Sequence, residues 1–198
     1  MSKNQIKYIS IILIALVLFT RLFNDIPNFT PVLPVILIFA LYFKSIKYMF
    51  VPILAIFISD IFLAYYLGGI YAEYLSLTFI NNSIDFHISS SCMLNYLMYL
   101  MIYFLMLFIP LEQEGKLSFE DVFGASLYSS IIFFIVSNFI VWMMPGGYPP
   151  TFSGFIQCYV MAIPFFGSTL ISTTLYSVIL FSPILYPSTK TVNILSNN

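Results

Sequence analysis

The chain has 198 residues, of which 61% are hydrophobic and only 8% are charged, and its mean hydropathy is +0.98. Because a soluble domain carries about 25% charged residues, this composition excludes a water-facing surface and predicts an integral membrane protein forming one domain over residues 1–198. The net charge of −1 gives no basis for a nucleic-acid partner. Cys92 and Cys158 belong to no metal-binding motif, so we expect neither a metal site nor a cofactor.

Six apolar stretches predict an all-α fold with six transmembrane helices, since a helical crossing takes about 20 residues. The predicted helices cover residues 6–23, 29–43, 48–67, 92–111, 123–144 and 156–185. The first follows Lys3 and Lys7 as a signal peptide would, but no small-residue cleavage site comes after it, so we expect it to be retained. The second is short and holds Pro31 and Pro34, which is also typical of a re-entrant half-helix.

The distribution of basic residues favours six crossings. If all six stretches cross, one side of the membrane holds Arg21 alone, and the other side holds Lys3, Lys7, Lys44, Lys47, Lys116 and Lys190. Cytoplasmic loops are enriched in Lys and Arg, so the N- and C-termini are both predicted to be cytoplasmic. The longest outer loop, 68–91, is long enough to fold over the outer face as a lid. On the inner side, Ser118 and Asp121 form a capping-box pattern that opens the fifth helix.

Polar side chains within the predicted helices gather toward the outer side. With a rise of 1.5 Å per residue, Asp60 lies roughly 10 Å below the outer boundary and Asn138 about 9 Å below the outer end of its helix. A charge inside a span costs about 2.5–3.5 kcal/mol, so Asp60 needs a partner, and Arg21 is the cation on that side. The pair has two interpretations: a structural tie between the first and third helices, or two members of a polar cavity that meets a ligand.

The stretch "SNFIVWMMPGGYPPTFSGF" at residues 137–155 predicts a pocket at the outer face. Asn138 and Trp142 are four residues apart and therefore project from one helix face. Taken singly, Asn138 suits an interhelical hydrogen bond and Trp142 suits a membrane-interface anchor. The prolines and glycines of "PGGYPP" restrict the turn that follows, which would hold the rings of Trp142 and Tyr148 in set positions suited to a planar ligand.

Several motifs resemble those of an uncharacterised family of small prokaryotic membrane proteins. They are "RLFNDIPNFTP" at 21–31, "SD" at 59–60, "SNFIVW" at 137–142 and "YPPTFSGFIQCYVMAIPFF" at 148–166. This family is in turn distantly similar to the substrate-binding S components of energy-coupling-factor (ECF) transporters, in length, helix number and placement of the loops. The first helix departs from those S components, because "YISIILIALVLF" lacks the Ala-x-x-x-Ala-like stripe with which they dock a coupling subunit.

The resemblance implies an ECF S-component-like bundle in the cytoplasmic membrane of a prokaryote. Its pocket would open outward, with loops 24–31 and 68–91 as gates. The expected partners are the lipid bilayer, a small-molecule ligand, and an ECF-type ATPase with its coupling subunit. The implied function is that of a substrate-binding subunit for uptake of a small, aromatic or heterocyclic micronutrient such as a vitamin.

The candidate ligand-binding residues combine charge, hydrogen bonding and aromatic stacking. They are Arg21, Asn28, Thr30, Asp60, Asn138, Trp142, Tyr148, Thr151 and Tyr159. We expect no catalysis, since the chain has no carboxylate pair and no metal-ligand cluster of the kind that enzymes use. Two other functions stay open: a structural or assembly protein whose polar layer orders the helices, and an intramembrane lipid-modifying enzyme with Asp60 or His87 as its base.

Overall fold

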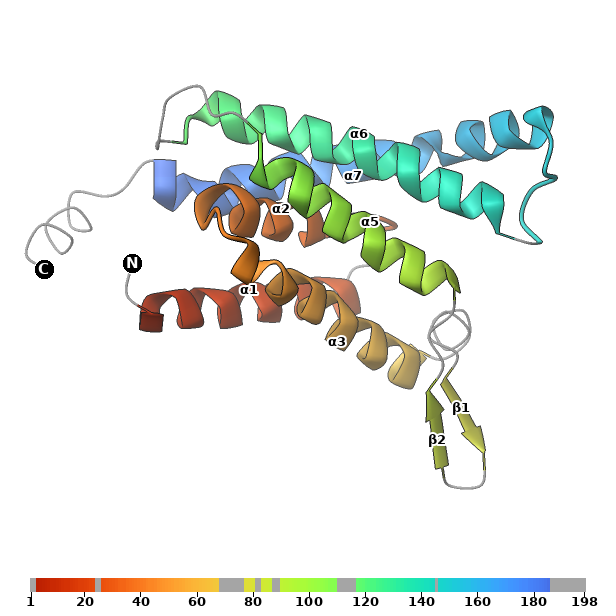
Figure 1. The fold of residues 1–198 in the computed structure, drawn as a ribbon, viewed down its shortest axis with the longest axis horizontal. Coiled ribbons are helices and arrows are strands. Elements are labelled where there is room, and N and C mark those ends of the chain that lie inside the picture. The colour runs from red at the N-terminus through yellow and green to blue at the C-terminus, as the bar shows by residue number, and fades with distance from the viewer. Residues whose placement is uncertain are drawn as a thin grey trace, which may run out of the picture.

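The computed structural model is a bundle of helices that run alongside one another, with a small β-hairpin at one end (Figure 1). It describes residues 3–23, 26–67, 77–80, 83–86, 90–109, 117–144 and 146–185. The helices are α1 (Lys3–Phe23), α2 (Val32–Leu37), a π-helix (Ile38–Tyr42), a 3₁₀ turn (Ile46–Tyr48), α3 (Phe50–Leu67), α5 (Ser90–Leu107), α6 (Phe119–Met143) and α7 (Phe152–Leu185). The strands are β1 (Leu77–Ile80) and β2 (Ser83–Phe86).

Three helices of the described part of the chain are long and apolar enough to cross a membrane. They are Ile46–Tyr65, Phe119–Met143 and Phe152–Ser182. These three helices support the prediction of a membrane protein with helical spans. That the chain crosses the membrane six times stays a prediction. The first turn of α1 and the last turn of α7 lie at the same end of the bundle (Figure 1), as an even number of crossings would require.

The second predicted helix, residues 29–43, is shorter than expected and lies at the centre of the bundle. Asn28 has a φ of 61° and Pro31 has a φ of −81° with a ψ of 13°, so the helix begins only at Val32. From Ile38 the segment continues as a π-helix, and the positive φ of 44° at Lys44 follows its end. Six α-helical and five π-helical residues rise about 16 Å, roughly half of a hydrocarbon layer.

This central segment forms the middle of the hydrophobic core. Every residue from Pro31 to Leu41 is buried. α1, α3, α5, α6 and α7 all contact α2. Tyr103 of α5 is fully buried and donates its hydroxyl to the carbonyl oxygens of Phe39 at 3.1 Å and Ser45 at 2.8 Å. These two bonds hold the π-helical end of the segment against α5.

The start of α6 confirms the predicted capping box. Ser118 Oγ accepts from the Asp121 backbone N–H at 3.0 Å, and the Asp121 carboxylate accepts from the Ser118 backbone N–H at 2.9 Å. The helix begins at Phe119, four residues before the predicted boundary at 123. Two backbone donors that a helix N-terminus leaves unpaired are satisfied in this way.

A β-hairpin lies within the predicted outer loop, residues 68–91, and is a departure from the expected all-α fold. Leu77 pairs with Phe86 and Ile80 with Ser83 in an antiparallel register. The sequence "LTFI" of β1 is rich in residues that favour strands. Residues 68–76, 81–82 and 87–89 of this loop, among them His87, lie outside the described residues, so the role of the loop as a lid or gate stays a prediction.

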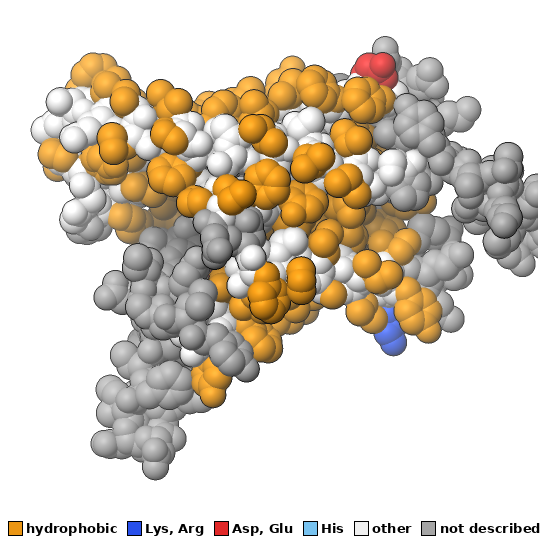
Figure 2. Space-filling view, turned by 180° about the vertical axis from the view of Figure 1, so that it is seen from behind, with side chains coloured by type: hydrophobic (Ala, Val, Ile, Leu, Met, Phe, Trp, Pro, Cys, Tyr) orange, Lys and Arg blue, Asp and Glu red, His pale blue; other side chains and the backbone are white. Residues whose placement is uncertain are grey.

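The outer surface of the bundle is mainly apolar, as a lipid-facing surface requires. Figure 2 shows hydrophobic side chains spread along the helices over the whole length of one face. The acidic and basic side chains visible among the described residues of that face lie at the end where α1 begins. On this face, the exposed charged side chains that are described therefore lie at the end of the bundle where α1 begins, which was predicted to be cytoplasmic.

Candidate functional site

An ion pair joins α1 to α3. Arg21 lies in the last turn of α1, and its Nη2 donates to Asp60 Oδ1 at 2.6 Å. Its Nη1 donates to the Ile56 carbonyl oxygen at 3.3 Å and to Ser59 Oγ. Tyr96 of α5 donates its hydroxyl to the other carboxylate oxygen of Asp60. The Asp60 side chain is only 4% exposed, and a charge so buried is stable only with such partners.

A cavity of about 560 Å³ lies beside this ion pair. Its walls come from the end of α1 and the segment after it, from α3, α5 and α6, and from one face of α7. The lining residues are Arg21, Leu22, Ile26, Pro27, Asn28, Thr30, Val32, Leu33, Leu63, Tyr99, Phe133, Thr169, Ser172 and Thr173. We call this space the main cavity. Its volume falls within the range of about 300–1,000 Å³ that is usual for small-molecule sites.

Polar side chains of the main cavity keep unused hydrogen-bonding capacity. The contacts of Arg21 with described residues occupy both Nη1 protons and one Nη2 proton, which leaves Nε–H and the second Nη2 proton. The side chains of Asn28, Thr30, Tyr99 and Thr173 make no hydrogen bond to any described residue. A buried polar group without a partner costs about 1–3 kcal/mol, so these groups suit a ligand that supplies partners.

The segment after α1 is tied to α7 where it borders the main cavity. Ser172 donates its hydroxyl to the Asn28 carbonyl oxygen at 3.2 Å and to the Thr169 carbonyl oxygen at 3.0 Å. The rings of Phe29 and Tyr176 contact each other with centroids 5.9 Å apart. The left-handed conformation of Asn28 is therefore held by contacts to a helix that lies 144 residues further along the chain.

A smaller cavity of about 200 Å³ adjoins the main cavity, and Asn28, Phe133 and Thr169 line both. We call it the annex. Its other lining residues are Phe134, Ser137, Asn138, Val141, Ala162, Phe165 and Phe166. The side-chain amide of Asn138 donates to the Phe134 carbonyl oxygen at 2.7 Å, which directs the amide nitrogen to its own helix. The annex is therefore a largely aromatic space with two amide side chains, those of Asn28 and Asn138, and two hydroxyl side chains among its lining residues.

The predicted site residues divide into two groups. Arg21, Asn28 and Thr30 line the main cavity, and Asn138 lines the annex. Asp60 lines neither and meets the main cavity through Arg21. The remaining four residues line neither cavity: Trp142, Tyr148, Thr151 and Tyr159.

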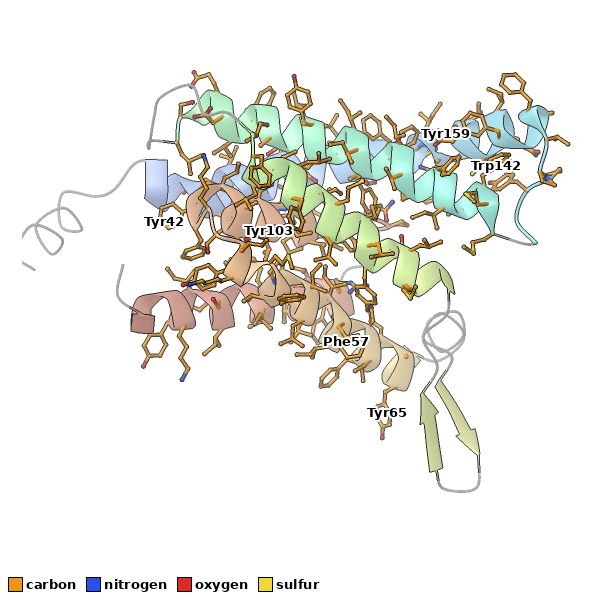
Figure 3. The ribbon with its side chains drawn as sticks, in the orientation of Figure 1. Tyr42, Phe57, Tyr65, Tyr103, Trp142 and Tyr159 are labelled. Carbon is orange, nitrogen blue, oxygen red and sulfur yellow. The ribbon has the colours of Figure 1, made fainter. Side chains whose placement is uncertain are left out.

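Three of these four residues, Trp142, Thr151 and Tyr159, have structural contacts within α6, α7 and the connection between them. Trp142 donates its indole N–H to the Pro149 carbonyl oxygen at 3.1 Å and contacts the ring of Phe155. Thr151 Oγ1 accepts from the backbone N–H of Gly154. Tyr159 donates its hydroxyl to the Ile135 carbonyl oxygen at 2.6 Å. Figure 3 places Trp142 and Tyr159 near the far end of the α6–α7 pair, away from the centrally located Tyr103.

Several residues of the site were not among the predicted set: Tyr96, Tyr99, Phe133, Ser172 and Thr173. Tyr96 and Tyr99 are three apart on α5, and Thr169, Ser172 and Thr173 recur at helical spacing, so each set shares one helix face. That spacing is a usable signal. In a chain with 15 tyrosines it does not single out Tyr96, which bonds Asp60, and Tyr99, which lines the main cavity.

The described residues contain no group of three His, Cys, Asp or Glu side chains that could hold a metal ion. Arg21 and Asp60 are each other's principal partner, and no second carboxylate contacts Asp60 within the described part of the chain. Among the described residues, the neighbours of Asp60 are therefore Arg21 and Tyr96, without a second carboxylate or a histidine.

The apolar surface, the three long apolar helices and the internal polar cavity define the class of this protein: a helical membrane protein with a cavity of small-molecule size. The chain belongs to a family of unknown function, DUF6580, whose model matches residues 1–192. No curated protein and no solved structure matches it. The similarity to ECF S components stays a prediction.

Proposed function

We propose that this protein is the substrate-binding membrane subunit of an uptake system for a small polar or heterocyclic molecule, and that the main cavity is its binding site. The observation that carries this proposal is the set of polar groups around one cavity that have hydrogen-bonding capacity not used by any described residue: those of Arg21, Asn28, Thr30, Tyr99 and Thr173. Polar groups that only ordered the helices would be expected to satisfy one another, as Arg21 and Asp60 do.

Each wall of the main cavity supplies a different kind of contact in this proposal. Arg21 binds an acceptor oxygen of the ligand through the N–H groups that bond no described residue. Thr30, Thr173 and Asn28 hydrogen-bond its polar edge. Tyr99, whose ring stacks on Phe133 at a centroid distance of 6.0 Å, supplies an aromatic wall. The predicted stacking role thereby passes from Trp142 and Tyr148 to these two rings.

The orientation we propose has the main cavity open to the outside of a prokaryotic cytoplasmic membrane. The support is the placement of lysines: Lys7, Lys44 and Lys47 belong to the end of the bundle where α1 begins, and Arg21 lies at the other end of α1. Cytoplasmic ends are enriched in such residues. Energy would come from separate partner subunits, of which an ECF-type ATPase and its coupling subunit are our candidates.

A structural or assembly role is the second candidate, and one observation favours it. The contacts of Arg21 and Tyr96 with α3 connect α1, α3 and α5 through a single carboxylate. Such a junction orders helices whether or not a ligand binds. The two roles predict different effects of substitutions in the cavity wall, which touch no part of that junction.

Native mass spectrometry of the protein released from lipid nanodiscs separates the two candidates. We expect a bound small molecule that is retained in Ser129→Ala and depleted in Thr173→Val. Both changes remove one hydroxyl of a buried residue, but Ser129 bonds the Ser126 carbonyl oxygen of its own helix whereas Thr173 lines the main cavity. Equal occupancy in the two variants, with equal thermal stability, would refute binding in the main cavity.

A further inference from the structure

The annex adds a second compartment to the proposed binding site, and the proposed function accounts for only the first. Because Asn28, Phe133 and Thr169 line both spaces, the two compartments are direct neighbours. The two compartments differ in chemistry. The main cavity has Arg21 and several hydroxyls, and the annex has phenylalanine rings on two helices.

The annex is suited to a single aromatic ring. Phe133 and Phe134 come from α6 and Phe165 and Phe166 from α7, and the rings of Phe134 and Phe166 are 4.8 Å apart between centroids. Ala162 is the small residue that leaves the space open. An apolar cavity of about 150 Å³ is large enough for benzene, and the annex measures about 200 Å³.

Asn138 is one of the polar residues that line the annex. Its side-chain amide uses one of two N–H groups on the Phe134 carbonyl oxygen, so Oδ1 remains as an acceptor together with the second N–H, and neither has a hydrogen-bond partner among the residues that the structure describes. An acceptor at the wall of an apolar space is matched by an N–H or O–H donor on the ring that enters it. At the other end of the site, the N–H groups of Arg21 that bond no described residue match a carboxylate.

We propose that the site binds a two-part ligand: a head with carboxylate-like acceptor oxygens in the main cavity and one aromatic ring with a hydrogen-bond donor in the annex, where it meets Asn138. This inference rests on the proposed function, since it assigns a ligand class to the same site. It also gives Asn138 and Ala162 separable roles: Asn138 selects the donor, and Ala162 makes room for the ring.

The test is isothermal titration calorimetry of the protein in lipid nanodiscs, with empty nanodiscs as the background. The probes are 4-hydroxyphenyl carboxylic acids with one, two or three methylene groups between ring and carboxylate, the matching phenyl acids without the hydroxyl, and acetate. We expect at least one hydroxyphenyl acid to bind about tenfold or more tightly than acetate, because its ring is buried. Loss of the hydroxyl should weaken binding about two- to tenfold.

Two variants assign these effects to the annex. Ala162→Leu fills the space, so ring-bearing acids should fall to the affinity of acetate while acetate itself is unaffected. Asn138→Leu should abolish the difference between hydroxyphenyl and phenyl acids while leaving ring binding in place, and it keeps the test decisive if Ala162→Leu does not fold. An unchanged preference for the hydroxyl in Asn138→Leu would overturn the inference, as would unchanged binding in Ala162→Leu.

The outcomes also separate this inference from the proposed function. If ring-bearing acids bind no more tightly than acetate, and that binding is lost in Arg21→Met, the annex is not part of the site but the main cavity still is. If none of the probes binds, the two-part ligand class is overturned, and the retained small molecule seen by mass spectrometry then decides on the main cavity alone.

Discussion

Replacing Asp60 with alanine should strongly destabilise the protein, because it leaves Arg21 without the carboxylate that neutralises it. The Arg21 side chain is 19% exposed and would keep only the contacts to Ser59 and the Ile56 carbonyl oxygen. Removing one member of a buried pair costs about 3–5 kcal/mol. With an unfolding entropy of about 2.1 cal/mol/K per residue, this cost lowers the Tm of a 198-residue chain by about 7–12 °C.

The assay is thermal unfolding in a single detergent, followed by circular dichroism, with Glu120→Gln as the control for loss of an exposed acidic residue. The double variant Arg21→Met/Asp60→Leu should recover most of the lost stability, since replacing both members of a buried pair by apolar residues is often neutral or better. It should not recover binding, because Arg21 lines the main cavity. A Tm for Asp60→Ala within about 2 °C of wild type would contradict the reasoning.

Four further substitutions, one of them a control, test the fold by the same thermal measurement. A Cβ at Gly154 would lie 2.1 Å from the Pro149 carbonyl oxygen, so Gly154→Ala should lower the free energy of unfolding by about 1–3 kcal/mol. Gly167→Ala is the control, because a Cβ there meets nothing within 4 Å and the change should be neutral or stabilising. Equal effects of the two changes would exclude close packing at Gly154 as the cause. Tyr103→Phe should cost about 1–3 kcal/mol, since it leaves buried carbonyl oxygens unpaired, and an unchanged Tm would show that those oxygens find other partners. Ser118→Ala should cost about 1 kcal/mol through loss of the capping box, and no loss would mean that the first turn of α6 does not depend on it.

Helices and caps were predictable because their signals are local. Apolar length marks α3, α6 and α7, and the capping box needs only Ser118 and Asp121. The Arg21–Asp60 contact was predictable from the free-energy cost of burying a charge in a span, because a buried carboxylate requires a partner and Arg21 was the cation predicted on the same side of the membrane. In these cases a few residues contain all the information that the physical argument uses.

The composition of the cavities was not predictable in the same way. Trp142 was expected at a binding site from its place beside a rigid turn, but its N–H is bonded within that turn. Thr173 and Tyr99 face the main cavity because of how α7 and α5 are rotated against the central segment. Rotation is set by packing among several helices, and no short stretch of sequence encodes it. The π-helix also depends on packing among several helices, because it changes the direction in which successive side chains project from a buried segment.

The short central segment, Val32–Tyr42, also bears on how the chain is inserted. Its 11 helical residues are too few to be recognised as an independent span by insertion machinery, and all but the last are buried against protein rather than lipid. We therefore expect it to enter the bilayer together with α3 and to reach its final position only when α5, α6 and α7 have been synthesised. Biogenesis would then end, rather than begin, with the part of the molecule that lies at its middle.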